Sequence, residues 1–480
     1  MMSMLRRNLR VFPLFALLLL APNLFSAIAD DSPTPSDLST ALEKLRDQFH
    51  APALAAAAMR DGRVVAIGSV GVRDLKSNTP VAIDDRTMIG SCGKAATRLL
   101  IGRLVDKDRL RWDSTLAELL PDVTMRDEYK SVTLGDIIGH RGGIQPYTMI
   151  SPQKTPVLFE PANSPREGRA AFITHLLSEP PAAPPKTRFV YSNAGYGLLG
   201  YIAERVLDKP YEQLMRDEVF RPLEMKSAVV GGPRENASMP GWGGHEKSPK
   251  GFEAVQRDRT GLPGIAPAGF MSCNVGDFAK LGVILVDIEA GKTSEFLGKA
   301  AVEKLPELRP GLKGSEGEVF FGGDGHYTAA FALWKSKGLS IVVQTNAGDS
   351  DDICEATINA VRAVVAPEIP ATGRQAARTV VRGGSGEAGS PGGAADSSQH
   401  GKYGFQIRAS ENESWTVDAV LPGSPAEAAG LKAGDQIIAI NGRPLADIPV
   451  EDRIASVKQS PLNLKLTREG KPVEVTMKLP

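Results

Sequence analysis

The chain has 480 residues, of which 42% are hydrophobic and 23% are charged, so it is long enough to form more than one globular domain. Its 56 basic residues balance 56 acidic ones, and no run rich in lysine or arginine suits phosphate contacts, which argues against nucleic acid as a partner. Three cysteines are too few for a disulfide framework, although one bridge is possible, and the six histidines form no ligand cluster. We therefore expect neither a metal nor another cofactor.

The first thirty residues have the pattern of a secretory signal. Arg6, Arg7 and Arg10 precede the apolar run "VFPLFALLLLAPNLF", which is shorter than the roughly 20 residues of a membrane-spanning helix. An A-x-A pattern at Ala27 to Ala29 indicates cleavage just after it. We expect a signal peptide at 1–29 and a mature chain without a stable membrane span, exported to the periplasm or the extracellular space. An uncleaved anchor is the alternative.

Strand and helix patterns alternate over the next 340 or so residues. An amphipathic helix is predicted at 38–49, followed by two apolar runs that meet at Asp61-Gly62, a hairpin signal. The later segment "AAFALWKSKGLSIVVQTNAG" repeats this pattern around Lys337-Gly338. Helical patterns lie between them at 92–107, 168–178, 194–207 and 275–290. This order predicts an α+β domain in which strands from both ends share one sheet.

The composition changes near residue 371. Residues 371–400 are rich in Gly, Ala and Ser, which predicts a flexible linker. A second, compact domain of strands and short helices is predicted at 401–480, with turns at Gly434-Asp435 and Asn441-Gly442. Its expected core residues are Ala428, Leu431, Ile437, Ile438 and Ile440.

The segment "MIGSCGKAATRLLIGRLV" at 88–105 places Ser91 and Lys94 at the start of a predicted helix. In one interpretation Ser91 is only the N-cap of a core helix. In the other, Lys94 lies one turn further on the same face and takes the proton of Ser91, because a desolvated lysine has a lowered pKa. The helix N-terminus also offers backbone N–H groups to an oxyanion.

A second Ser-x-x-Lys pattern, Ser151 to Lys154, serves as an internal comparison. Pro152 lies inside it and no amphipathic helix follows, so it is predicted to be a loop. Only Ser91 has the strand, turn and helix setting that a nucleophile needs.

The segment "TRFVYSNAGYGLLGYIAERV" contains Tyr191 and Asn193 just before a helix predicted to start near Ala194. A tyrosine beside a lysine ammonium can release its proton more easily and act as a base or a relay, and an asparagine amide can bind a substrate carbonyl. In the alternative interpretation Asn193 is the N-cap and Tyr191 packs in the core.

Taken in order, "GSCGK", "IIGHRGGIQPY", "YSNAGYGLLGYIAE", "LGVILVD" and "LSIVVQTNAG" resemble the serine β-lactamase and penicillin-binding-protein-like hydrolases. Within them the pattern is most similar to the branch of class C β-lactamases, D-Ala-D-Ala carboxypeptidases and esterases, over about residues 35–366. The resemblance implies an antiparallel sheet with helices on both faces plus a helical subdomain, and a small acyl or peptide substrate. It makes Ser91 the acylated nucleophile, Lys94 its proton acceptor, Tyr191 the proton relay and Asn193 a ligand of the substrate amide.

The family's third motif, Lys-Thr-Gly or His-x-Gly, is altered here. Its place is taken by "VFFGGDGHYTAAFALW", which puts Phe320, Phe321 and Gly322 at the three positions. The usual cation is therefore absent, and His326 is the nearest candidate to replace it. Since that cation helps to hold an anionic substrate group in the family, a neutral ester or amide is favoured over a penicillin-like substrate.

The family resemblance still implies a function for the glycines of this segment. Gly322 and Gly323 permit a close approach of two backbones. The backbone N–H near Gly323 or Asp324 is expected to complete an oxyanion hole with that of Ser91.

Other features receive simpler interpretations. His140 in "GHRGG" is expected to be structural, with Arg141 a candidate to reach a substrate carboxylate, and Cys92 is expected to be a small buried side chain. The sequence has no G-x-S-x-G nucleophile elbow, which disfavours a Ser-His-Asp triad.

Residues 401–480 closely resemble a PDZ domain of the type found on exported bacterial proteases, through "YGFQI" and "GSPAEAAGLKAGDQIIAINGRPL". In such a domain successive backbone N–H groups capture a chain-terminal carboxylate, and the following strand pairs with the bound peptide. A domain with an occluded groove is the alternative. The predicted peptide-binding residues are Tyr403, Gly404, Phe405, Gln406 and Ile407.

The sequence thus predicts a signal peptide (1–29), a β-lactamase-like serine hydrolase domain (30–370), a linker (371–400) and a PDZ domain (401–480). The PDZ domain would bind a protein or peptide C-terminus and locate or regulate the hydrolase. The alternative is a catalytically silent first domain that binds a ligand, with the whole chain acting as an adaptor.

Overall fold

The computed structural model describes residues 34–234, 240–255, 262–305 and 316–371, together with part of the C-terminal region. In that region the described residues are 403, 405–409, 415–420, 424–432, 434–448, 457, 461–468 and 471–477. The predicted signal peptide (1–29) and almost all of the predicted linker (371–400) lie outside the described residues.

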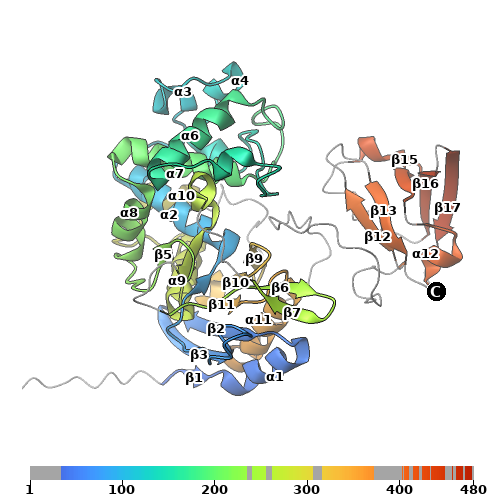
Figure 1. Ribbon diagram of the computed structural model, residues 1–480, viewed down its shortest axis with the longest axis horizontal. Coiled ribbons are helices and arrows are strands. Elements are labelled where there is room, and N and C mark those ends of the chain that lie inside the picture. The colour runs from blue at the N-terminus through green and yellow to red at the C-terminus, as the bar shows by residue number, and fades with distance from the viewer. Residues whose placement is uncertain are drawn as a thin grey trace, which may run out of the picture. The chain divides into compact units, whose positions relative to one another are not determined.

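Figure 1 shows the elements that these residues form and labels many of them. The strands are β1 (Ser36–Asp37), β2 (Ala53–Arg60), β3 (Arg63–Gly71), β4 (Thr87–Met88), β5 (Val229–Val230), β6 (His245–Ser248), β7 (Gly251–Ala254), β8 (Met271–Cys273), β9 (Val319–Gly323), β10 (Thr328–Trp334), β11 (Leu339–Thr345), β12 (Phe405–Ala409), β13 (Trp415–Val420), β14 (Gln436–Ile440), β15 (Arg443–Pro444), β16 (Leu462–Arg468) and β17 (Lys471–Met477). The α-helices are α1 (Ser39–Phe49), α2 (Gly93–Asp106), α3 (Leu116–Leu119), α4 (Asp127–Lys130), α5 (Leu134–Ile138), α6 (Pro165–Ser178), α7 (Asn193–Leu207), α8 (Tyr211–Leu214), α9 (Val275–Glu289), α10 (Lys299–Lys304), α11 (Asp351–Val365) and α12 (Pro425–Ala428). Further helical turns are η1 (Gly90–Cys92), η2 (Pro156–Phe159), η3 (Met215–Phe220), η4 (Pro263–Ala268), η5 (Lys335–Lys337) and η7 (Leu445–Asp447).

The main sheet joins the two ends of the first domain, as the sequence predicts. Its strand order is β1-β3-β2-β11-β10-β9, and the antiparallel pairing of β2 with β11 brings Ala57 opposite Val342. The β2–β3 hairpin turns at Asp61-Gly62, where both residues have positive φ. One pairing departs from the antiparallel sheet that we expected, because β1 runs parallel to β3.

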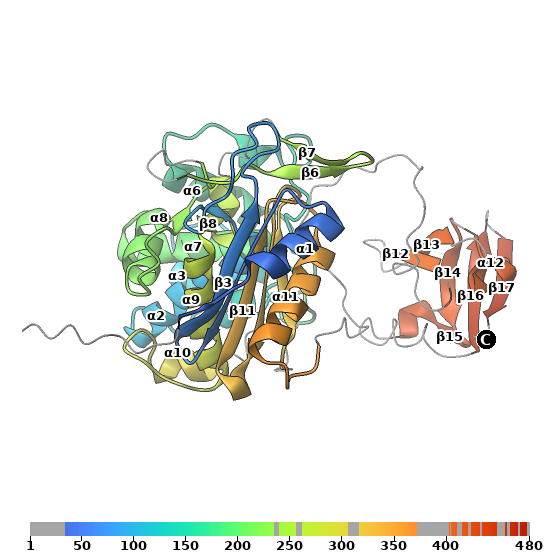
Figure 2. The ribbon, with the colours of Figure 1, turned by 90° about the horizontal axis from the view of Figure 1, so that it is seen from below.

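Both faces of this sheet are covered by helices, which explains why β2 is made almost entirely of small apolar residues. Along β2, Ala55 and Ala57 face one hydrophobic cluster, while Leu54 and Ala56 face another. Helices α1 and α11 lie side by side over the second face, and α9 packs on the first (Figure 2). The α+β arrangement predicted from the sequence is therefore confirmed.

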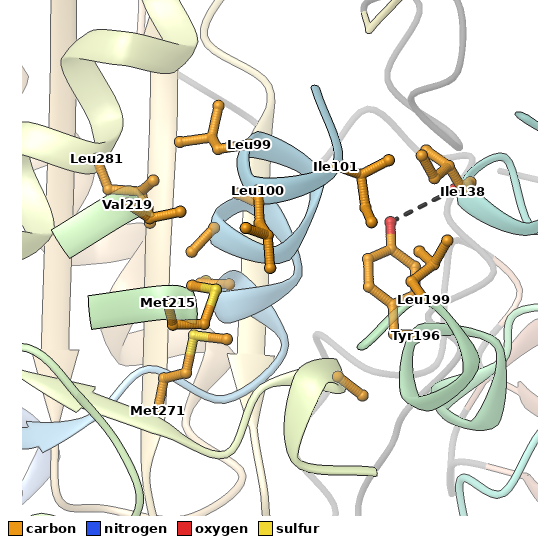
Figure 3. Packing of buried hydrophobic residues seen from close by; sticks show 14 of the residues in the cluster. Leu99, Leu100, Ile101, Ile138, Tyr196, Leu199, Met215, Val219, Met271 and Leu281 are labelled. Atoms are coloured by element: carbon orange, nitrogen blue, oxygen red, sulfur yellow. Dashed lines mark hydrogen bonds between the residues drawn. The ribbon is translucent and has the colours of Figure 1, made fainter. Parts of the chain in front are cut away.

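Helix α2, which was predicted at 92–107, runs through the larger of the two clusters. Leu99, Leu100 and Ile101 are each at most 1% exposed, and Figure 3 shows Leu100 near Met215 and Ile101 near Tyr196 of α7. A helix that is apolar on nearly all sides is a core helix rather than an amphipathic surface helix. Any polar side chain in its first turns therefore lies in an environment with little water.

The C-terminal region forms a separate sheet in the order β12-β13-β14-β16-β17, with β15 paired to β14. The predicted core positions Leu431, Ile437 and Ile440 are buried. Two predictions are wrong: Ile438 is 47% exposed because β14 alternates its faces, and Ala428 is exposed at the end of α12.

Three further observations concern membrane spans, disulfides and metal sites in the described residues. None of the helices in this part of the chain has the length and apolar character needed to cross a bilayer. Cys92, Cys273 and Cys354 are all buried and free, so the bridge left open by the sequence is not formed. Within the same residues, no group of three His, Cys, Asp or Glu side chains could hold a metal ion.

Candidate active site

Ser91 lies on the short turn η1, between β4 and the core helix α2. Strand β4 pairs with β8, and the N–H of Ile89 donates to the carbonyl of Met271 at 3.0 Å, which anchors the turn. The helix itself begins at Gly93, and the Ser91 side chain makes no capping hydrogen bond. The interpretation of Ser91 as an N-cap is therefore wrong, and its hydroxyl has other partners.

The side chain of Lys94 is buried beneath Ser91, with only 3% of the residue exposed. Its Nζ lies 2.6 Å from the Ala268 carbonyl oxygen, 2.7 Å from Asn193 Oδ1 and 3.3 Å from Ser91 Oγ. Burial lowers the pKa of Lys94 from its ordinary value to about 7. A substantial fraction of the lysine is thus neutral near physiological pH.

The neutral amine has a defined orientation in this environment. It has two N–H donors and one lone pair, and the oxygens of Ala268 and Asn193 can only accept. Since these two oxygens make the shorter contacts, they take both N–H groups and leave the lone pair toward Ser91 Oγ. The hydroxyl of Ser91 then donates to Lys94, which is the arrangement that a proton acceptor requires.

Tyr191 approaches the same oxygen from another side. Its hydroxyl donates to Ser91 Oγ at 2.8 Å, and Lys94 Nζ lies 4.8 Å from the centre of its ring. Burial raises the pKa of Tyr191 above its ordinary value, although the hydrogen bond to Ser91 opposes the shift. The expectation that the neighbouring lysine makes the phenol more acidic is therefore wrong, and Tyr191 is a proton donor in the resting site.

Asn193 is the first residue of α7, and the N-cap is Ser192, whose Oγ accepts from the N–H of Gly195 at 2.8 Å. The N-cap interpretation of Asn193 is thus wrong by one residue. While its Oδ1 accepts from Lys94, its Nδ2 donates to the Tyr147 carbonyl at 3.0 Å. Asn193 thereby connects the lysine to the loop that carries Tyr147, and Asn193 also lines the pocket beside Ser91.

His140 supports the turn that holds Tyr191 and Asn193. Its Nδ1 accepts from the Ser192 N–H at 3.1 Å, and its ring lies 4.7 Å from that of Tyr191. Burial, with the nearby charges of Lys94 and Arg98, holds the pKa of His140 well below its ordinary value, so the ring is neutral. The structural role expected for His140 is confirmed. Arg141 is exposed, donates to the Lys186 carbonyl and does not line the pocket.

The end of strand β9 lies directly against the turn that carries Ser91. A Cβ built on Gly322 would lie 2.4 Å from the Ile89 carbonyl oxygen and 2.7 Å from the Ser91 nitrogen, so only glycine fits. Gly90 has a φ of +49°, and a Cβ built on it would lie 2.4 Å from the nitrogen of Gly323. The backbone N–H groups of Ser91 and Gly323 thus come from adjacent segments, as an oxyanion hole requires.

This contact leads to a stability prediction. Replacing Gly322→Ala should lower the free energy of unfolding by about 1–3 kcal/mol, because the strand must move away from backbone atoms that cannot yield. The melting temperature and kcat/KM should fall together. The matched control is Gly276→Ala near the start of α9, where the nearest atom to a new Cβ is 3.6 Å away and no loss is expected. An unchanged melting temperature in Gly322→Ala would contradict the close contact.

A pocket opens beside Ser91, and most of its walls are apolar. Asp324 and Gly323 line it, whereas His326 does not. The structure therefore does not support His326 as a replacement for the missing cation. The lining residues are Met88, Gly90, Ser91, Thr148, Ile150, Asn193, Leu262, Ile265, Ala268, Gly269, Phe270, Gly323 and Asp324.

The two phenylalanines of the altered third motif pack against the hydrophobic core. The ring of Phe320 stacks on that of Phe331 with centroids 5.2 Å apart, and Phe321 packs against the hydrophobic cluster on the other face of the sheet. No lysine, arginine or histidine is among the residues that line the pocket, all of which the structure describes.

The second predicted site lies in the C-terminal sheet and is described in part. Tyr403 and Phe405 are buried, and the carbonyl of Tyr403 accepts from the Ala426 N–H at 2.9 Å. Gln406 and Ile407 belong to strand β12, and Gly404 lies outside the described residues. In the described sheet β12 pairs with β13 alone, at the end of the strand order.

Sequence reasoning found the polar groups of the site but not what surrounds them. It missed the Ala268 carbonyl, which accepts from Lys94, and the walls formed by residues such as Ile150 and Phe270. Backbone carbonyls carry no sequence signal, and apolar wall residues are indistinguishable from core residues in a single sequence. The altered third motif was the one signal of an apolar pocket.

Comparison with known proteins gives two matches to family models. Residues 38–364 match the model described as "Beta-lactamase", and residues 394–468 match the model described as "PDZ domain". Together these segments cover most of the chain, and the first contains every residue of the site around Ser91.

Individual relatives are distant. The chain is 28% identical over 191 residues to penicillin-binding protein 4 of Amycolatopsis lactamdurans, covering 39% of this chain and 47% of that protein. It is 26% identical over 279 residues to the unguisins hydrolase ungD of Aspergillus violaceofuscus, and the match covers 54% of this chain and 47% of that protein. The matched part thus spans about half the length of these relatives. The structure of the octameric penicillin-binding protein homologue from Pyrococcus abyssi aligns with a TM-score of 0.58 at 16% identity, covering 91% of this chain and 94% of that one, which shows a shared fold.

Proposed function

Because the chain belongs to the beta-lactamase family and carries a C-terminal PDZ domain, we propose that this serine hydrolase cleaves esters through an acyl-enzyme formed on Ser91. The observation that carries the proposal is the convergence of Lys94 Nζ and the Tyr191 hydroxyl on Ser91 Oγ. A hydroxyl held by a base with a pKa of about 7 and by a proton donor is an activated nucleophile.

The proposed reaction has two steps. In the first, Ser91 Oγ forms a bond to the ester carbonyl carbon while its proton passes to Lys94 Nζ, and the N–H groups of Ser91 and Gly323 hold the oxyanion. The carbon–oxygen bond to the leaving alcohol then breaks, and Tyr191 supplies the proton that the alcohol needs, itself reprotonated from Lys94. In the second step water attacks the acyl-enzyme by the same route and releases the acid.

The pocket suggests which acyl compounds the enzyme accepts. Family members with a cation in the third motif use it to hold an anionic group, and here Phe320 and Phe321 occupy those positions without lining the pocket. A carboxylate next to the scissile bond would meet apolar walls and the carboxylate of Asp324. We therefore propose esters without such a carboxylate as substrates, rather than β-lactams or peptides that end in D-alanine.

A matched pair of compounds tests the substrate class. The purified protein should hydrolyse p-nitrophenyl butyrate and should cleave the methyl ester of a chromogenic cephalosporin at least about tenfold faster than the free acid, because one close charge is worth about this much. Equal or faster cleavage of the free acid would contradict the pocket argument. If no ester or lactam is turned over, the catalytically silent adaptor becomes the better account.

The C-terminal region has a second proposed activity. Strand β12 (Phe405–Ala409) lies at the end of its sheet in the described residues, and such an edge can pair with an extended peptide. We propose that residues 403–407 bind the C-terminus of a protein or peptide and thereby locate the hydrolase. The proposed organisation is a cleaved signal peptide at 1–29, a hydrolase domain at 30–370, a linker at 371–400 and a PDZ domain at 401–480, with export to the periplasm or the extracellular space.

A further inference from the structure

Asp324 follows the last residue of β9 and lines the same pocket as Ser91 and Gly323. Among the residues that line this pocket, all of them described, Asp324 is the one with a charged side chain. Its position next to Gly323 places it beside the backbone that would hold the substrate carbonyl. A substrate bound for attack by Ser91 is therefore close to this charge.

The Asp324 carboxylate is fixed in place by its own loop. Its Oδ1 accepts from the N–H groups of His326 at 3.0 Å and Tyr327 at 3.1 Å, the two residues just before β10. Among the described residues, no donor bonds to Oδ2. In the described part of the chain, no lysine, arginine or histidine forms an ion pair with Asp324.

The apolar surroundings of Asp324 strengthen its attraction for a cation. Asp324 is half-buried, and Leu262, Ile265 and Phe270 form apolar walls of the pocket. Apolar walls weaken the screening by water, so that a carboxylate attracts a cation inside the pocket more strongly than on the open surface. The buried amine of Lys94 donates to Asn193 and Ala268, and its neutral form is the one that accepts the proton of Ser91.

We propose that Asp324 makes the pocket select esters that carry a positive charge near the reacting carbonyl, such as an ammonium group, over neutral esters of the same shape. The inference rests on the proposed esterase function and adds to it the charge of the preferred substrate.

Two pairs of esters that differ only in charge test this proposal. In the first, butyrylcholine is compared with 3,3-dimethylbutyl butyrate, which puts the charge in the alcohol. In the second, the p-nitrophenyl ester of 4-(trimethylammonio)butanoate is compared with that of 5,5-dimethylhexanoate, which puts it in the acyl group. The readout is the ratio of kcat/KM, charged over neutral, within each pair.

The wild-type ratio should be about tenfold or more in at least one pair and should fall as salt is added. In Asp324→Asn, which keeps the Oδ1 acceptor but removes the charge, the ratio in that pair should approach one. The exposed Asp113→Asn is the matched control and should leave the ratio as in the wild type.

The outcomes separate this inference from the function on which it rests. Turnover of both members of each pair with a ratio near one, or a wild-type ratio retained in Asp324→Asn, would overturn the role of Asp324 and leave the esterase intact. No turnover of any of the four esters would overturn both.

Discussion

Replacing Ser91→Ala is expected to reduce kcat/KM for p-nitrophenyl butyrate by at least about 10³-fold, as the loss of a serine nucleophile does in other hydrolases. The physical reason is that Lys94 and Tyr191 converge on one oxygen, Ser91 Oγ, and the variant removes that oxygen. The measurement is steady-state hydrolysis at pH 8, together with thermal unfolding to show that the variant folds.

The chain provides a matched control in its second Ser-x-x-Lys pattern. Ser151 lies in a loop turn, where its Oγ accepts from the N–H of the exposed Lys154. Replacing Ser151→Ala should leave kcat/KM within about threefold of the wild type, since nothing there activates the hydroxyl. A folded Ser91→Ala variant with wild-type turnover would contradict Ser91 as the nucleophile.

The second large effect is expected from Lys94→Met, which keeps the length of the side chain but removes the base. We expect kcat/KM to fall by roughly 10²–10⁴-fold, the usual contribution of a positioned general base. Asn193 and Ala268 lose a hydrogen-bond donor in this variant, so thermal unfolding must accompany the kinetics. Lys154→Met in the exposed loop is the control and should be active.

The wild-type pH profile tests the same residue without a mutation. Lys94 accepts a proton only when it is neutral, and burial places its pKa at about 7 rather than at its ordinary, higher value. Going upward in pH, kcat/KM should therefore rise through about pH 7 and level off above it. An activity that is flat from pH 5 to pH 9, or that falls on going above pH 7, would contradict Lys94 as the base.

Much of the fold could be predicted because its patterns are local. The turn at Asp61-Gly62 and the periodicity of the segments that became α2 and α9 are visible in the sequence, and each formed as expected. The errors arose where burial depends on distant partners. Ile438 is as apolar as Ile437, but the pleat of β14 turns it to the surface, and no local signal distinguishes the two.

The residues of the site could be predicted from the sequence, but their protonation states could not. Ser91, Lys94, Tyr191 and Asn193 were found by their motifs and lie together in the structure. Their protonation depends on burial, which a sequence shows poorly. The lowered pKa of Lys94 followed from its apolar neighbours, whereas the raised pKa of Tyr191 reversed the expectation because desolvation outweighs the hydrogen bond to Ser91.

The most direct test of the central claim is to label the mature protein with a fluorophosphonate and to map the adduct by peptide mass spectrometry. We predict one adduct, on Ser91, that forms faster as the pH rises through about 7 and is absent from Ser91→Ala. An adduct on another residue, or none with several acylating probes on the folded protein, would contradict the assignment of Ser91 as the residue that is acylated.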